Sequence, residues 1–395
     1  MIFDLKMLRQ SNRPIVIFGA GVTGEAVLFA CRSLGITVKA FCDNNKMKCG
    51  QKVMGIPVLY APDVKNHFAD VLFVVSVIDI QDIAAQFEQW GNIDFCPAAE
   101  LLRTYDVYSH QYSKPGSFVE YVVSACISSQ DSYIDPEKLF IRSVDLVITE
   151  RCSLKCRNCS NLMQYYTAPV DYPLDVIEKS MRNLATLADE INELRIIGGE
   201  PFMNRQWPQI TRIAFSLKNV NRILFYTNGT ICPNPETLKE FSDSRTMFYI
   251  TDYGKSSRNI DRLCDILSNL KINYIRNPAG GWTDCSGISL HSRSNSEHQD
   301  IFDCCCVKNC FTLSNGRFYR CPFAANADQL KAIPEFENDS VDLLASDISK
   351  KQLIAFIRRR DYIQACRFCS GRKLDDPQIP PAIQTPKPLA YTKMR

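Results

Sequence analysis

The chain has 395 residues, enough for two or three structural units, because one hydrophobic core rarely serves more than about 250–300 residues. Its 46% hydrophobic and 23% charged residues are ordinary for a globular enzyme, and its net charge of +3 is too small to indicate a nucleic-acid or anionic-membrane partner. No apolar run reaches the roughly 18 residues of a membrane span, and the N-terminal residues lack a signal-peptide core. We therefore expect a cytoplasmic protein without a membrane span.

Residues 1–105 predict a small α/β domain. Short apolar strands are expected at 14–18, 38–42, 56–60 and 71–77, with helices that end near Leu34 and that cover 81–90. This alternation predicts a parallel sheet. Residues 106–140 predict a weakly helical connector.

A glycine-rich turn joins the first strand to the first helix. Its GxGxxG pattern comprises Gly19, Gly21 and Gly24, and Asp43 ends the second strand. The helix N-terminus would hold phosphates, and Asp43 could accept a hydrogen bond from a ribose hydroxyl. The unit resembles the small Rossmann-like domains for nucleotides or sugar nucleotides on enzymes of bacterial surface-sugar pathways. The other reading is a scaffold without a ligand that serves interaction.

From Val144 the alternation of strand and helix starts again. Strands are expected at 144–148, 194–197, 222–227, 247–250 and 272–275, and helices at 174–189, 208–218, 235–243 and 258–269. This winding predicts a partial barrel over residues 141–281. A cysteine-rich region, 282–376, and an extended tail, 377–395, follow.

Eighteen cysteines are unusual in reducing cytosol, where disulfides are rare. Those that group in the sequence favour metal or cluster ligation, and the scattered ones predict small buried hydrophobic side chains. The first group, Cys152, Cys156 and Cys159, directly follows a strand. Three thiolates in one loop can hold three corners of an iron–sulfur cubane and leave the fourth iron open, whereas zinc usually takes four ligands.

This CxxxCxxC loop resembles the cluster-binding loop of the radical S-adenosylmethionine (SAM) superfamily, although an aromatic residue often stands where Asn158 is. The resemblance implies a partial (β/α)6 barrel with a [4Fe–4S] cluster and SAM bound at one rim. Three further motifs agree with it: the family's GGEP, the TNG that contains Asn228, and a polar group near the SAM ribose at Asp252. The GGEP residues, which would hold the amino group of SAM, are Gly198, Gly199, Glu200 and Pro201.

The mechanism that the resemblance implies is specific. SAM chelates the open iron, and one electron from a reductase, flavodoxin or ferredoxin cleaves it to a 5′-deoxyadenosyl radical. That radical abstracts a hydrogen atom from the substrate. The protein supplies positioning and excludes solvent.

The second group predicts another site. Asn315-Gly316 is a strong hairpin signal, and its register would place Cys310 opposite Cys321. Cys366 and Cys369 form a CxxC that completes four ligands. The pattern resembles the SPASM and twitch auxiliary-cluster domains of radical SAM enzymes and implies one auxiliary [4Fe–4S] cluster. The family's usual spacing would fit Cys304, Cys305 or Cys306 in place of Cys310, and a structural zinc site is the alternative to a cluster.

Three functions follow as hypotheses. The first is a radical SAM enzyme that oxidises, epimerises or rearranges a carbohydrate or sugar nucleotide, with the sugar inferred by analogy with the N-terminal domain. The second is a radical SAM peptide maturase, although a GxGxxG unit stands where a peptide-recognition module is expected. The third is a non-catalytic, zinc-binding interaction protein, which would have no use for GGEP or TNG.

Overall fold

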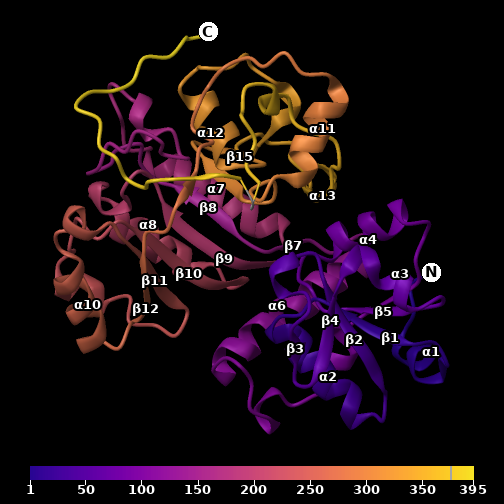
Figure 1. Ribbon diagram of the computed structural model, residues 1–395. Coiled ribbons are helices and arrows are strands. Elements are labelled where there is room, and N and C mark those ends of the chain that lie inside the picture. Colours follow the sequence, from indigo (N-terminus) through magenta and orange to yellow (C-terminus); the bar gives the residue numbers. More distant parts are fainter. Residues whose placement is uncertain (374–375) are drawn as a thin grey trace. The chain divides into compact units, whose positions relative to one another are not determined.

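The computed structural model describes residues 1–373 and 376–395 (Figure 1). They form two compact units, 1–140 and 141–395. No described helix is long and apolar enough to cross a membrane.

The first unit is built on a six-stranded sheet in the order β3-β4-β2-β1-β5-β6. All neighbouring strands are parallel except β3 and β4. The strands are β1 (Ile15–Phe18), β2 (Val38–Asp43), β3 (Lys52–Val53), β4 (Ile56–Tyr60), β5 (Leu72–Val75) and β6 (Phe95–Pro97). The helices are α1 (Leu5–Gln10), α2 (Val22–Ser33), α3 (Val64–His67), α4 (Ile80–Gln89), α5 (Ala99–Arg103) and α6 (Gly116–Ile134). The predicted parallel sheet is confirmed.

Both faces of this sheet are buried, because successive strand residues point to opposite sides. Ile15 and Ile17 of β1 pack with α2 and α6, while Val16 and Phe18 pack against residues of α4. The interpretation of 106–140 as a weakly helical connector was wrong. The 19-residue helix α6 buries Val119, Val123 and Cys126 in the core of the first unit, so this unit extends to residue 140.

The second unit contains a sheet in the order β12-β11-β10-β9-β8-β14-β15-β16. The strands β8 to β12 are parallel neighbours, as expected for a partial barrel. They are β8 (Val144–Val147), β9 (Glu190–Ile197), β10 (Val220–Thr227), β11 (Thr246–Asp252) and β12 (Asn273–Pro278), and β7 (Phe140–Ile141) precedes them. The connecting helices are α7 (Leu174–Leu187), α8 (Trp207–Ser216), α9 (Pro235–Lys239) and α10 (Ile260–Asn269).

The predicted hairpin forms, with Thr312 opposite Tyr319 and Ser314 opposite Arg317. Its first strand, β14 (Phe311–Ser314), pairs in parallel with β8, so the hairpin extends the barrel sheet. The separation of 282–376 from the barrel was therefore wrong, since residues 141–395 form one unit. The remaining elements are β13 (Trp282–Thr283), α11 (Asn295–Cys304), β15 (Arg317–Tyr319), α12 (Pro322–Gln329), β16 (Ser340–Asp342), α13 (Lys350–Ile357) and β17 (Gln378–Ile379).

Candidate active site

The first cysteine group lies in the loop after β8, at the carboxyl end of the barrel strands. Its thiols are buried or half-buried, and burial raises the pKa of each above the ordinary value for cysteine, to about 11 for Cys159. Backbone N–H groups face two of the sulfurs. Leu154 donates to Cys152 Sγ at 3.5 Å, and the backbone N–H groups of Asn161 and Met163 lower the pKa of Cys159 against the effect of burial. The loop thus offers the hydrogen bonds that stabilise a thiolate.

The GGEP segment after β9 packs directly against this loop. A Cβ atom on Gly199 would lie 2.5 Å from both Arg151 O and Cys152 Cβ, and one on Gly198 would lie 2.5 Å from Thr149 O. Gly199 N donates to Thr149 O at 3.1 Å, and Glu200 N donates to Arg151 O at 2.8 Å. The two glycines therefore permit a close backbone approach, and the partner within this chain is the cysteine loop itself.

Glu200 is fully buried and joins the ends of two strands. Its carboxylate accepts hydrogen bonds from Thr227 Oγ1 at 2.8 Å and from Asn228 N at 2.9 Å. Removal of the carboxylate from water raises its pKa to about 7, against the lowering effect of these donors. A cation beside Glu200 would bring this pKa down again.

Asn228 connects the end of β10 to the cysteine loop. Its side-chain Nδ2 donates to Ser153 Oγ at 3.1 Å and lies 3.8 Å from Cys152 Sγ. Thr230 and Ser153 are also hydrogen-bonded through their hydroxyl groups. The ends of three neighbouring strands thus meet at one rim.

Asp252, at the end of β11, forms a hydrogen bond and an ion pair with nearby residues. Its carboxylate accepts from Gly254 N at 2.8 Å and pairs with Arg276 at 2.7 Å, and the guanidinium keeps its pKa below the ordinary value. Contact of Asp252 with a ribose stays a prediction. The neighbouring Tyr253 lies close enough to Cys156 and Cys159 for their charges to affect its pKa, which desolvation raises.

One face of the barrel strands carries polar side chains that the sequence analysis missed. Arg195 pairs with Glu193 at 2.6 Å and approaches Asp145 at 3.7 Å, and its guanidinium lies 5.6 Å from the ring centroid of Tyr226. Tyr226 stacks on Tyr249 at 4.8 Å. Burial raises the pKa of Asp145 to about 6, although Arg195 opposes this. The alternation of charged and apolar residues within 190–197 was the available signal.

Residues 146–251 match the model of the Radical SAM superfamily. This segment includes the cysteine loop and strands β9 and β10. The chain is 28% identical over 106 residues to a GTP 3′,8-cyclase of Syntrophomonas wolfei, and this match covers 25% of this chain and 30% of that enzyme. A GTP 3′,8-cyclase of Chlorobaculum tepidum is 33% identical over 97 residues, or 23% of this chain and 28% of the enzyme. The match thus spans less than a third of these curated relatives.

Two solved structures are similar to the chain at low identity. BtrN in complex with AdoMet and 2-DOIA covers 59% of this chain and 94% of its own, with 14% identity and a TM-score of 0.40. The AdoMet-bound anSMEcpe covers 58% of this chain and 84% of its own, with 10% identity and a TM-score of 0.39.

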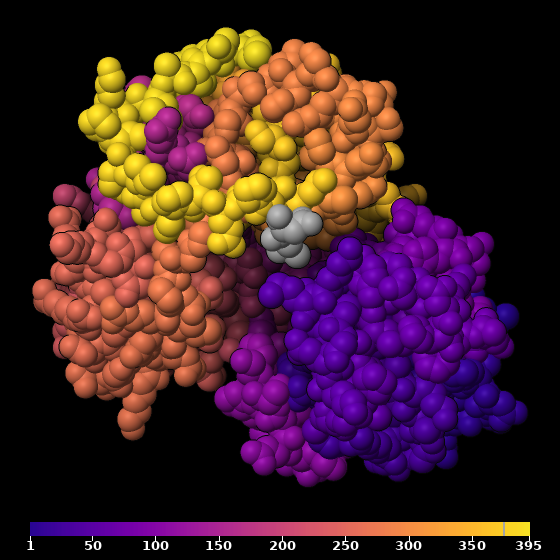
Figure 2. Space-filling model, viewed as in Figure 1, coloured from indigo at the N-terminus to yellow at the C-terminus, as the bar shows by residue number. Residues whose placement is uncertain are grey.

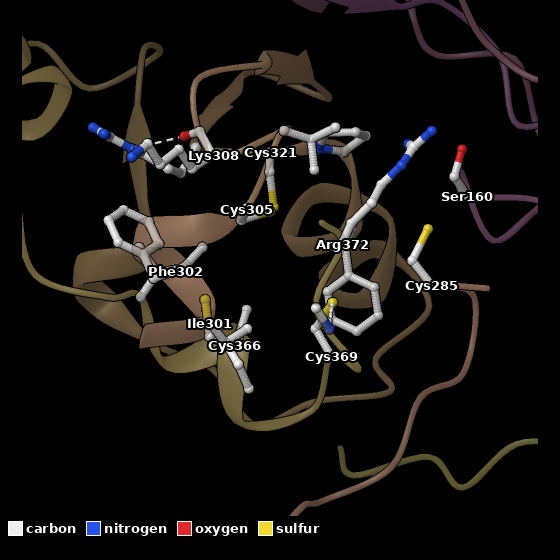
Figure 3. A pocket seen from close by; sticks show the side chains of 17 residues that line it. Ser160, Cys285, Ile301, Phe302, Cys305, Lys308, Cys321, Cys366, Cys369 and Arg372 are labelled. Atoms are coloured by element: carbon white, nitrogen blue, oxygen red, sulfur yellow. Dashed lines mark hydrogen bonds between the residues drawn. The ribbon is translucent and has the colours of Figure 1, made fainter. Parts of the chain in front are cut away.

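The second cysteine group surrounds a pocket that is lined in part by residues directly after the β14–β15 hairpin (Figure 3). Its lining includes Cys305, Cys321, Cys366 and Cys369 and also Cys285, but Cys310 does not line it. Cys305, the alternative to Cys310, therefore lies with the other three cysteines, and which of the two binds a cluster stays a prediction. The hairpin pairing stops at Tyr319, and Cys321 turns away to cap α12, so the pairing of residues 310 and 321 is not formed. Cys310 instead lies near Asp145 and Arg195.

Each of these four thiols faces a backbone N–H group. Ala324 N donates to Cys321 Sγ at 3.5 Å and Gly371 N donates to Cys369 Sγ at 3.4 Å. Val307 and Arg372 donate to Cys305, and Ile363 donates to Cys366. Burial raises the pKa of all four thiols. Among residues 1–373 and 376–395, no three His, Cys, Asp or Glu side chains are grouped closely enough to hold a single metal ion. A [4Fe–4S] cubane needs a wider arrangement, because each thiolate binds a different iron at its own corner.

The glycine loop of the first unit is shaped by its own packing. Gly19 has a left-handed φ of 110°, and a Cβ on Gly24 would lie 2.1 Å from Gly19 O. Gly21, at the N-terminus of α2, has open space around it. Asp43 accepts from Ala20 N at 3.0 Å and pairs with Lys48 at 2.8 Å. Its carboxylate therefore holds the loop, and a contact with a ribose stays a prediction.

Proposed function

We propose that the chain is a radical SAM enzyme with a cluster on Cys152, Cys156 and Cys159. The observation that supports this best is the meeting of the cysteine loop with Glu200 and Asn228 at one barrel rim. A three-thiolate cluster fits the loop, because three thiols lie within eight residues and N–H groups face their sulfurs. Such a cluster, when bound with SAM, supplies a carbon radical that removes a hydrogen atom from a substrate.

The protein's own residues would bind and orient SAM. The backbone around Gly198 and Gly199 and the Glu200 carboxylate would receive its amino group, since a buried carboxyl with a raised pKa gains a favourable partner in an ammonium. The Tyr253 ring, near the cluster thiols, would exclude water from them.

We also propose one auxiliary [4Fe–4S] cluster at the second cysteine pocket, on Cys305, Cys321, Cys366 and Cys369. Four buried thiols, each with an N–H donor, support a cluster over a chance grouping. Cys285 lines the same pocket and is the alternative ligand if one of these four does not bind the cluster.

Anaerobic reconstitution tests both sites. We expect about eight irons per chain, because two four-iron clusters are proposed, and reductive cleavage of SAM to 5′-deoxyadenosine. Cys156→Ala should lose cleavage and retain about four irons at the auxiliary site. Cys232→Ala, a scattered cysteine outside both groups, is the control. Two zinc ions and no cleavage would contradict the proposal.

For the substrate, we propose a carbohydrate or sugar nucleotide, with the first unit as a Rossmann-like nucleotide-binding domain. The glycine loop follows β1, which has β2 on one side and β5 on the other, so the strand order reverses there. Ligands of parallel α/β sheets bind at such a position, and phosphates bind at helix N-termini. The open space at Gly21 leaves room for one.

Calorimetry on the full chain with nucleoside diphosphates and their sugars tests this proposal. Gly21→Glu should weaken binding at least tenfold, because it puts a carboxylate where a phosphate would lie, whereas Gly21→Ala should bind normally in the same open space. Equal binding by the two variants would count against the site. Turnover of a peptide, without nucleotide binding, would favour the peptide maturase.

A further inference from the structure

The C-terminal arm, residues 378–395, is attached along the second unit at several points (Figure 2). Its first residues form β17, which pairs with β13, and near its end Met394 N donates to Lys331 O at 2.8 Å. Between these points the arm crosses the cysteine loop. Arg157 N donates to Ile383 O at 2.7 Å, and Thr385 N donates to Lys155 O at 2.7 Å. The predicted tail is extended, and it is bonded to the loop on both sides of Cys156.

Gln384 is the arm residue that reaches a cluster thiol. Its Nε2 donates to Cys156 Sγ at 3.2 Å and to Ala382 O at 2.7 Å. Its Oε1 accepts from Lys155 N at 2.6 Å. The amide orientation is determined by these partners, because a backbone N–H can only donate and a carbonyl can only accept. The N–H side of the amide therefore faces the sulfur.

The source of the donor distinguishes Cys156 from the other two cysteines. Cys152 accepts from Leu154 N in its own loop and from Asn228 Nδ2 at the end of a neighbouring barrel strand, and Cys159 faces backbone N–H groups of the loop. The Cys156 donor comes instead from the C-terminal arm, 228 positions away, where the arm is hydrogen-bonded to the loop on both sides of this cysteine. The arm thus contributes a hydrogen bond that the loop does not make by itself.

A hydrogen bond to a cluster sulfur stabilises the more negative, reduced state. Hydrogen bonds to the sulfurs are among the factors that set the reduction potential of iron–sulfur clusters. The sulfur of this bond belongs to a buried residue, Cys156, whereas the donor Gln384 is exposed. Loss of the donor should therefore lower the potential and make the cluster harder to reduce.

We propose that Gln384 is a positioning residue that raises the reduction potential of the cluster on Cys156 and ties the arm to the cysteine loop. This inference rests on the proposed function, because it needs a cluster at that loop. Gln384 acts through Cys156 and would touch neither SAM nor substrate.

The experiment is an anaerobic redox titration of the full reconstituted chain, followed by electron paramagnetic resonance. The signal that SAM addition alters is assigned to the cysteine-loop cluster. Gln384→Leu and Gln384→Met both remove the amide, and the unbranched Met keeps the side-chain length if Leu disturbs the loop. Gln378→Leu, the same change elsewhere on the arm, is the control.

We expect up to a tenfold smaller reduced fraction at a fixed potential in the Gln384 variants, a shift of about 59 mV to more negative values for a one-electron couple. The iron content of Gln384→Met and the potential of Gln378→Leu should equal those of the unaltered protein. An unchanged potential in Gln384→Met would overturn the role of Gln384 and leave the proposed function intact. Absence of a SAM-sensitive cluster in the unaltered protein would overturn the proposed function, and this inference with it.

Discussion

The two cysteine groups differ in how the chain assembles them. The first lies within eight consecutive residues after one strand, and two of its sulfurs receive N–H groups from the same loop. The second draws Cys305 from the end of α11, Cys321 from the start of α12, and Cys366 and Cys369 from a segment 45 or more positions later. A site within one loop is specified by spacing, whereas a site made from distant segments depends on the whole fold.

The largest expected effect concerns the distant segments. Cys305→Ala should lose the auxiliary cluster, about four of about eight irons, because this thiol lines the pocket with an N–H donor on it. Cys310→Ala should keep all of them, since it lies near Asp145 instead. Iron analysis of the two purified variants measures the difference. The opposite result would make Cys310 the ligand in place of Cys305.

A smaller effect is expected near the first cysteine group, from the buried carboxylate of Glu200. Its folded pKa of about 7 lies above the ordinary 4.5, so its contribution to stability is fully present below about pH 4.5 and is lost as the pH rises through about 7. Without SAM, the unaltered protein should lose up to about 3 kcal/mol relative to Glu200→Gln over this interval. Urea unfolding at several pH values measures this loss. If the free energy of unfolding changes equally with pH in the two proteins, the raised pKa of Glu200 is contradicted.

The smallest effect is expected from the glycine that packs on the loop. Gly199→Ala should lower the free energy of unfolding by about 1–3 kcal/mol, the usual cost of overpacking, because the new Cβ meets Cys152 Cβ and Arg151 O. Gly280→Ala, with open space around it, should leave stability nearly unchanged. Denaturant unfolding at fixed pH compares the two. Equal free energies of unfolding in the two variants would mean that the cysteine loop shifts to accommodate the new Cβ at little cost.

Much of the fold could be predicted from local patterns. The strands of both sheets and the order of the first motifs follow from short apolar runs, because parallel strands are buried on both faces. The pairing of β14 with β8 could not be predicted, because residues 311 and 144 are distant in sequence and neither strand has a pattern that indicates its partner strand. The helix α6 was underestimated because its polar residues hide the apolar face that packs on α2.

The candidate site divides in the same way. Cys152, Cys156 and Cys159 were identified from spacing and the GGEP residues from a family resemblance, and the structure brings them together. Gln384 gave no signal in the sequence, because a glutamine in a proline-rich tail is ordinary and its partner is 228 positions away. The replacement of Cys310 by Cys305 likewise depended on where β15 ends.

The parallel pairing of β14 with β8 has a consequence for electron transfer. The cysteine loop follows β8, Cys321 follows the partner strand of β14, and Ser160, next to Cys159, lines the second pocket. Backbone hydrogen bonds of one sheet therefore connect the strand before the cysteine loop to the hairpin before Cys321. If clusters occupy both sites, an electron would tunnel between them within the second unit.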